Sequence, residues 1–101
     1  MENVKGINKT RIFTYLDDRG ISRSLTGYSY LVDAICFMME HPASKMTDVY
    51  GFLSDSTEIP SEKIQGCIRY ALICSTSPCA KRPREFVKNA CYTLLNEEVK
   101  S

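Results

Sequence analysis

Two side chains that can read DNA bases lie one helical turn apart in the middle of the chain. Gln65 and Arg69 are four residues apart, so in a helix both project from the same side. An arginine can donate two hydrogen bonds to guanine O6 and N7, and a glutamine can pair with adenine N6 and N7, each worth about 1–3 kcal/mol of discrimination. The pair predicts contact with bases in a groove. The alternative is that both are solvated side chains, with Arg69 in a surface salt bridge.

An amphipathic helix over residues 60–75 is predicted to position this pair. Its apolar residues recur at helical spacing: Ile64, Cys67, Ile68, Ala71 and Leu72. Its other side carries Glu62, Gln65, Gly66 and Arg69. Pro60 suits the first turn, and Glu62 complements the positive end of the helix dipole. One face is therefore core and the other is free to bind, with Ser61, Glu62 and Lys63 as further candidate DNA contacts.

A second amphipathic segment precedes this helix. Residues 45–54 carry an apolar stripe of Met46, Val49, Tyr50 and Leu53, followed by a short polar stretch at 54–58 that we interpret as a turn. Two helices joined by a tight turn form a helix-turn-helix, here over about residues 45–75. We expect Gly51 to let the two helices approach closely.

Candidate phosphate contacts fall in two further places. Ser44, Lys45 and Thr47 lie at the start of the 45–54 helix, where free N–H groups favour anions. The densest basic cluster comes later in the chain and consists of Lys81, Arg82, Arg84 and Lys88. The alternatives are that the first group only caps its helix and that the second is a solvated basic face.

The rest of the chain is also predicted to be helical. We expect helices over 9–18, capped by Asn8 or Thr10 and ended by Gly20, over 27–40, ended by Pro42, and over 84–98. The 27–40 segment is the most hydrophobic and should be central, with Tyr28, Tyr30 and Phe37 in the core. The prediction is an all-α fold of about five helices in one domain, 1–101, with a loose tail at 1–8.

Composition sets the class of protein. The 101 residues have a net charge of +1, with 44% hydrophobic and 25% charged residues, which suits one globular domain and gives no strong overall field toward nucleic acid. No apolar run is long enough for a membrane span, and the first residues lack the apolar core of a signal peptide. We therefore expect a cytoplasmic protein that does not bind membranes.

The cysteines and the histidine give little sign of chemistry. Five cysteines, an odd number, are widely spaced, and we interpret them as reduced and buried. Cys74 and Cys79 could form half of a metal site, and His41 could pair with a cysteine, but no complete ligand or catalytic set is recognisable. We predict no cofactor, no metal and no enzymatic activity.

Three stretches resemble one known family. Residues 27–35, Gly-Tyr-Ser-Tyr-Leu-Val-Asp-Ala-Ile, look like the Gly-Tyr-x-Tyr-Leu-x-x-Ala-Ile signature of the C-terminal effector domain of the sporulation stage-zero response regulator of endospore-forming bacteria. Residues 61–72, Ser-Glu-Lys-Ile-Gln-Gly-Cys-Ile-Arg-Tyr-Ala-Leu, resemble its recognition helix, and 84–87, Arg-Glu-Phe-Val, its final helix. The similarity covers about residues 10–97.

The resemblance implies an all-α DNA-binding domain. The 60–75 helix would enter the major groove, and the 45–54 helix would lie across the backbone. The family's receiver domain is absent from the sequence, so we expect no aspartyl-phosphate switch in this chain. Gln65 and Gly66 occupy positions at which the family has charged, base-reading side chains. Where the family has an additional short helix that contacts neighbouring protomers, this chain has only the short segment 75–83.

Two functions follow from these patterns. The first is a sequence-specific double-stranded DNA-binding protein, a transcriptional regulator that can form a homodimer on DNA. The second is the same fold reused as a protein-binding module, which the near-neutral charge, Gly66 and an exposed Ile73 favour.

Overall fold

The computed structural model describes residues 9–75 and 82–100, with side chains up to residue 96. Within these ranges the chain forms helices α1 (Lys9–Asp18), α2 (Thr26–Glu40), α3 (Met46–Thr57), α4 (Ser61–Ile73) and α5 (Pro83–Lys100). No strand occurs in this described part, so the prediction of an all-α single domain is confirmed. The predicted tail at 1–8 lies outside the described residues.

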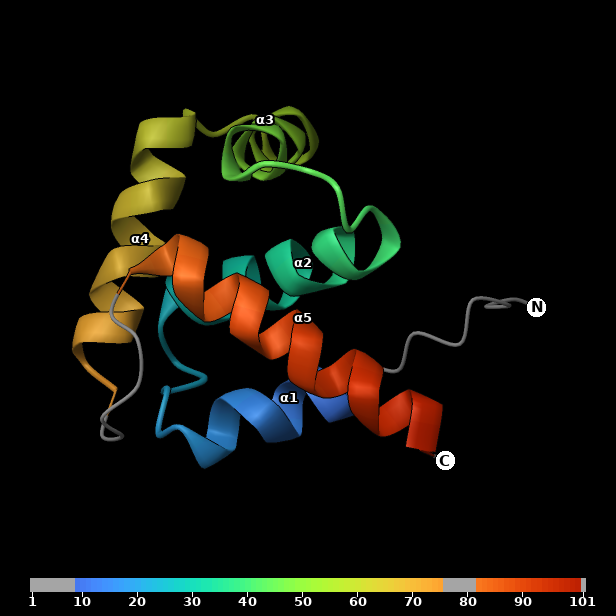
Figure 1. Ribbon diagram of the computed structural model, residues 1–101. Coiled ribbons are helices and arrows are strands. Elements are labelled where there is room, and N and C mark those ends of the chain that lie inside the picture. Colours follow the sequence, from blue (N-terminus) through green and yellow to red (C-terminus); the bar gives the residue numbers. More distant parts are fainter. Residues whose placement is uncertain (1–8, 76–81, 101) are drawn as a thin grey trace.

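Helix α2 is the centre of the fold. It contacts each of the other four helices, and Figure 1 shows it running through the middle with α3 above it and α4 to one side. Nine of its 15 residues are buried, including Tyr28 and Tyr30, as its hydrophobic sequence predicts. Phe37 is only half-buried and packs at the edge of the core.

Gly20 ends the first helix as predicted. Its φ of 74° is left-handed, and its N–H donates to the Asp17 carbonyl at 2.9 Å. The Ile21 N–H donates back to the Leu16 carbonyl at 3.2 Å, and both side chains are buried. This pairing is a Schellman motif, which a glycine forms without steric cost. Thr10 lies inside α1 and is therefore not its cap, and the alternative cap, Asn8, lies outside the described residues.

The boundaries of α3 differ from the prediction at both ends. Lys45, and not Ser44, is the capping position, and its N–H donates to the Asp48 carboxylate at 3.1 Å. At the other end the polar stretch predicted as a turn is helical to Thr57. The Thr57 hydroxyl donates to the Leu53 carbonyl at 2.7 Å, which accommodates a polar side chain inside a last helical turn.

The connection from α3 to α4 is a three-residue turn of Glu58, Ile59 and Pro60. Glu58 has a left-handed φ of 60°, and its N–H donates to the Ser54 carbonyl at 2.8 Å. Pro60 is the capping residue of α4, which begins at Ser61, one position after the predicted start. Two consecutive helices therefore meet through a tight turn and contact each other.

The close approach between helices depends on Gly27 and not on Gly51. A methyl group on Gly27 would overlap the Cys67 carbonyl oxygen and come within 2.9 Å of Ala71 Cβ, because the first turn of α2 lies against the backbone of α4. A methyl group on Gly51 would meet nothing within 4 Å. The packing role expected for Gly51 is therefore wrong, since this residue faces outward from α3.

The two glycines give opposite expectations for an added methyl group. Gly27→Ala should lower the free energy of unfolding by about 1–3 kcal/mol through overpacking. Gly51→Ala should raise it by about 0.5–1 kcal/mol, because alanine costs less backbone entropy in an open helical position. Urea denaturation followed by circular dichroism measures both. Equal stability of the two variants would contradict this account of the α2–α4 contact.

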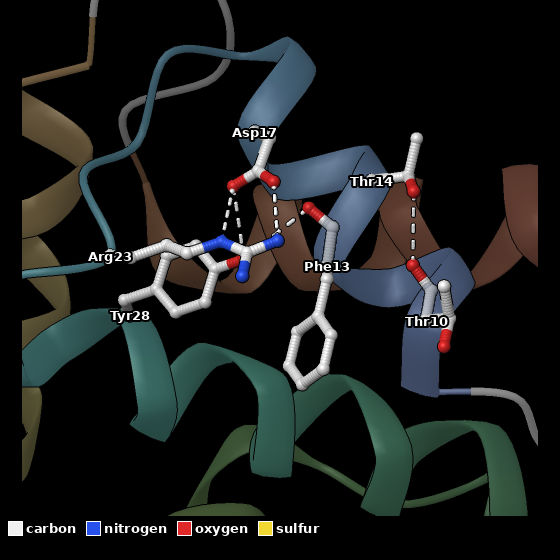
Figure 2. A network of polar contacts seen from close by, with 6 residues as sticks. All are labelled: Thr10, Phe13, Thr14, Asp17, Arg23 and Tyr28. Atoms are coloured by element: carbon white, nitrogen blue, oxygen red, sulfur yellow. Dashed lines mark hydrogen bonds and ion pairs between the residues drawn. The ribbon is translucent and has the colours of Figure 1, made fainter.

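A polar cluster joins the end of α1, the following connector and the start of α2 (Figure 2). Arg23 binds the Asp17 carboxylate at 2.7 and 3.2 Å, and the Tyr28 hydroxyl donates to the same carboxylate at 3.0 Å. The guanidinium carbon also lies 5.3 Å from the Phe13 ring centre. The hydrogen bond from Arg23 lowers the pKa of Asp17.

This lowered pKa predicts a pH-dependent contribution to stability. The contribution is complete above the unfolded-state pKa of about 3.9 and is lost as pH falls through the lower folded-state value. The variant Asp17→Asn lacks this contribution from the carboxylate. The urea midpoints of the parent and the variant should therefore differ near neutral pH and converge at acidic pH. A midpoint difference that does not change from pH ~6 to pH ~2.5 would show that the carboxylate charge has no part in the cluster.

Candidate nucleic-acid interface

The outer face of α4 is exposed as its amphipathic pattern predicts. Ile64, Ile68, Ala71 and Leu72 are fully buried against the core, and Cys67 is half-buried. Of the candidate contacts, Glu62, Lys63 and Arg69 are exposed, whereas Ser61 and Gln65 are half-buried. The same face also carries Gly66, Tyr70 and Ile73, of which the last two are 58% and 60% exposed.

The candidate residues of α4 divide between two flanks. Each residue turns the helix by about 100°, so Gln65 and Arg69 share one flank and Lys63 lies on the other. Arg69 lies toward α3, where burial raises the pKa of the Tyr50 phenol and the Arg69 charge opposes this rise. Arg69 and Gln65 are thus brought together, but Lys63 is set apart from them.

Lys63 belongs to a hollow between α4 and the α1–α2 connector. This hollow measures about 490 Å³ and is lined by Ser24, Leu25, Thr26, Gly27, Lys63, Gly66, Cys67 and Tyr70. Gly66 is open to solvent, with nothing within 4 Å of an added methyl group. Sequence reasoning missed Tyr70 as a surface residue. Tyr70 is four residues after Gly66 and seven after Lys63, and this helical spacing would have placed it on the same exposed side of the helix.

The start of α3 and the start of α5 form a second hollow, which we call the basic hollow. It measures about 630 Å³ and is lined by Pro42, Ala43, Ser44, Lys45, Met46, Thr47, Arg84 and Lys88. Lys45, Arg84 and Lys88 are exposed, and no carboxylate is among the lining residues. The structure therefore joins two groups of candidate phosphate contacts that are about 40 residues apart in sequence.

The backbone at this end of α3 is partly available to a ligand. The N–H groups of Asp48 and Val49 donate to the Lys45 carbonyl, at 2.9 and 3.2 Å. Those of Met46 and Thr47, at the first two helical positions, have no partner within a helix. The Asp48 carboxylate stands close by and accepts from the Lys45 N–H, so its negative charge offsets part of the positive field.

The rest of the basic cluster adjoins this hollow. Arg82 lines a neighbouring hollow with Arg84, Glu85, Lys88 and Asn89. It forms a long ion pair with Glu85, at 3.7 Å, in which both side chains are exposed. Lys81, the first residue of the predicted cluster, lies outside the described residues.

The cysteines show no metal or catalytic arrangement in the described part of the chain. Cys91 is buried, Cys36 and Cys67 are half-buried, and Cys74 is exposed, so the prediction of buried thiols is wrong for Cys74. Cys79, the partner proposed for Cys74, is outside the described residues. Among those described, no three metal-ligating side chains come together, and no helix is long and apolar enough to cross a membrane.

Comparison with protein-family models, curated proteins and solved structures finds no match for this chain. The resemblance to the sporulation effector domain stays a prediction that rests on the quoted residues alone.

The cysteines should differ sharply in reactivity. Burial raises the pKa of the Cys91 thiol to about 12, and Cys91 is only 6% exposed. Iodoacetamide should therefore alkylate Cys74 at least about tenfold faster than Cys91, because Cys74 is exposed to the reagent whereas burial disfavours the thiolate of Cys91. Peptide mapping by mass spectrometry identifies each site, and unfolding in urea should remove the difference. Equal rates in the folded protein would contradict the buried position of Cys91.

Proposed function

We propose that this protein binds double-stranded DNA and acts as a transcriptional regulator. Helix α4 enters the major groove with Gln65 and Arg69 toward the bases, and the basic hollow receives phosphates of the flanking backbone. In this arrangement α3 and α4 act as a helix-turn-helix. The observation that carries the proposal is the convergence of Lys45, Arg84 and Lys88 at the start of the helix that precedes α4.

The charges also favour one direction of approach. Asp55 and Glu58 lie near the end of α3, and Glu62 lies in the first turn of α4. These carboxylates repel phosphates, so the backbone approaches from the side of the basic hollow. Ser61 and Glu62 lie in the first turn of α4, whereas Lys63 lies on the flank opposite Gln65 and Arg69.

Fluorescence anisotropy with a labelled duplex tests this function. Affinity should fall with salt with a log–log slope of about −0.9 per phosphate contact. Removing two contacts in the double variant Arg84→Ala, Lys88→Ala should make the slope shallower by about 1.8. Lys9→Ala is the control. It removes a positive charge that lies outside the basic hollow and outside the neighbouring hollow of Arg82, so it should leave the slope unchanged. If the double variant kept the slope of the parent, the basic hollow would not be the phosphate site.

Base reading needs a separate comparison. A duplex with the box that the family recognises, a scrambled duplex and a random-duplex selection together establish whether a preferred sequence exists. Arg69→Ala should weaken binding to the preferred site by about 1–3 kcal/mol and relax the preference at one base pair. Equal weakening on all duplexes would assign Arg69 to the backbone. The stoichiometry at saturation distinguishes one copy from a homodimer on DNA.

A protein-binding role for the same α4 face is the second candidate. Tyr70 and Ile73 leave apolar surface exposed beside the hollow that contains Gly66, which suits a protein partner better than a phosphate backbone. This function predicts weak DNA binding without sequence preference, together with a stoichiometric complex that Ile73→Ser disrupts. Failure of Ile73→Ser to affect any isolated complex would contradict it. Either function is compatible with a cytoplasmic protein.

A further inference from the structure

Aromatic rings from two helices cluster on the surface between α2 and α3. The ring centres of Phe37 and Phe52 lie 4.8 Å apart, and the ring centre of His41 lies 4.7 Å from that of Phe37. Phe52 is 45% exposed, and His41 is also exposed. We call these three residues the aromatic patch. Single exposed apolar residues are ordinary, but a cluster that joins two helices and remains open is not explained by the core.

Carboxylates predominate around the aromatic patch, although the charge of Lys9 acts on Asp33 and opposes the rise that burial causes in the pKa of its carboxyl. Residues three or four positions away on the same helix are surface neighbours of each ring. For Phe37 and Phe52 these positions include four carboxylates and neither lysine nor arginine: Asp33, Glu40, Asp48 and Asp55. Asp33 is half-buried and the other three are exposed. In a chain with a net charge of only +1, this is a local concentration of negative charge around an apolar centre.

We propose that the aromatic patch is a docking surface for a basic amphipathic segment of another protein. An aliphatic anchor of that segment covers Phe52, and arginines or lysines beside the anchor pair with the carboxylates and lie over the ring faces. The charge of the patch excludes a nucleic-acid occupant, because phosphates would meet the carboxylates. The aromatic patch is a different surface from the outer face of α4, although Asp48 lies close to both the patch and the basic hollow.

The docking surface is tested by selecting binders from a displayed library of random peptides. The peptides are about 15 residues long, which allows a helical segment. Peptides enriched on the parent protein should carry net positive charge and at least one aliphatic or aromatic anchor. Phe52→Ser should weaken the selected peptides about tenfold or more, as expected for a central apolar contact. Tyr92→Ser is the matched control, since it removes a ring that is 72% exposed on α5 and should leave binding unchanged.

The charges provide a second and independent readout. The double variant Asp48→Asn, Asp55→Asn should weaken the selected peptides and reduce the dependence of affinity on salt. Circular dichroism verifies that each variant is folded. Three results would overturn the proposal: no enrichment above the Phe52→Ser protein, enriched peptides that are neutral or acidic, or self-association of the parent that Phe52→Ser abolishes, which would assign the patch to a second copy.

Discussion

The arrangement of this protein depends on the close crossing of α2 and α4 at Gly27. The absence of a side chain there lets the first turn of α2 lie directly against the Cys67 carbonyl. Because α2 contacts every other helix, this crossing fixes α4 relative to the whole core. Helix α4 in turn presents its polar face outward at an angle that its own sequence does not determine. The exposed side of the candidate interface is thus set by a residue on another helix.

The basic hollow shows how tertiary packing creates a site that no continuous segment contains. Lys45 comes from the start of α3, whereas Arg84 and Lys88 come from the first turns of α5. Each group alone is an ordinary solvated basic stretch. Packed together, they give three positive charges around a helix end with free N–H groups. Electrostatic attraction of a phosphate grows with the number of cations within a Debye length, which is about 8–10 Å at physiological salt.

Much of this fold was predictable from periodicity, and the failures have identifiable causes. All five helices were expected because apolar residues at helical spacing determine which face is buried, as in Ile64, Ile68 and Leu72. The end of α3 was misjudged because Ser56 and Thr57 favour turns in isolation but here donate to carbonyls of their own helix. The close helix packing was expected at Gly51 and was found at Gly27, because sequence alone does not show whether a glycine faces solvent or another backbone. Which basic groups meet depended on how α3 and α5 each pack against α2, which periodicity does not encode.

Three of the four charged residues in α3 and its two capping positions oppose the helix macrodipole. Cations surround its positive N-terminal end, Asp55 and Glu58 lie near its negative C-terminal end, and no basic residue occupies the last turn. Only Asp48, in the first turn, opposes this trend. Such an inverted distribution lowers the intrinsic stability of a helix. In the proposed DNA complex, a phosphate at the N-terminal end would neutralise this unfavourable charge, so phosphate binding and the stability of α3 would be thermodynamically linked. The cations that destabilise this helix end would then be the ones that hold the phosphate.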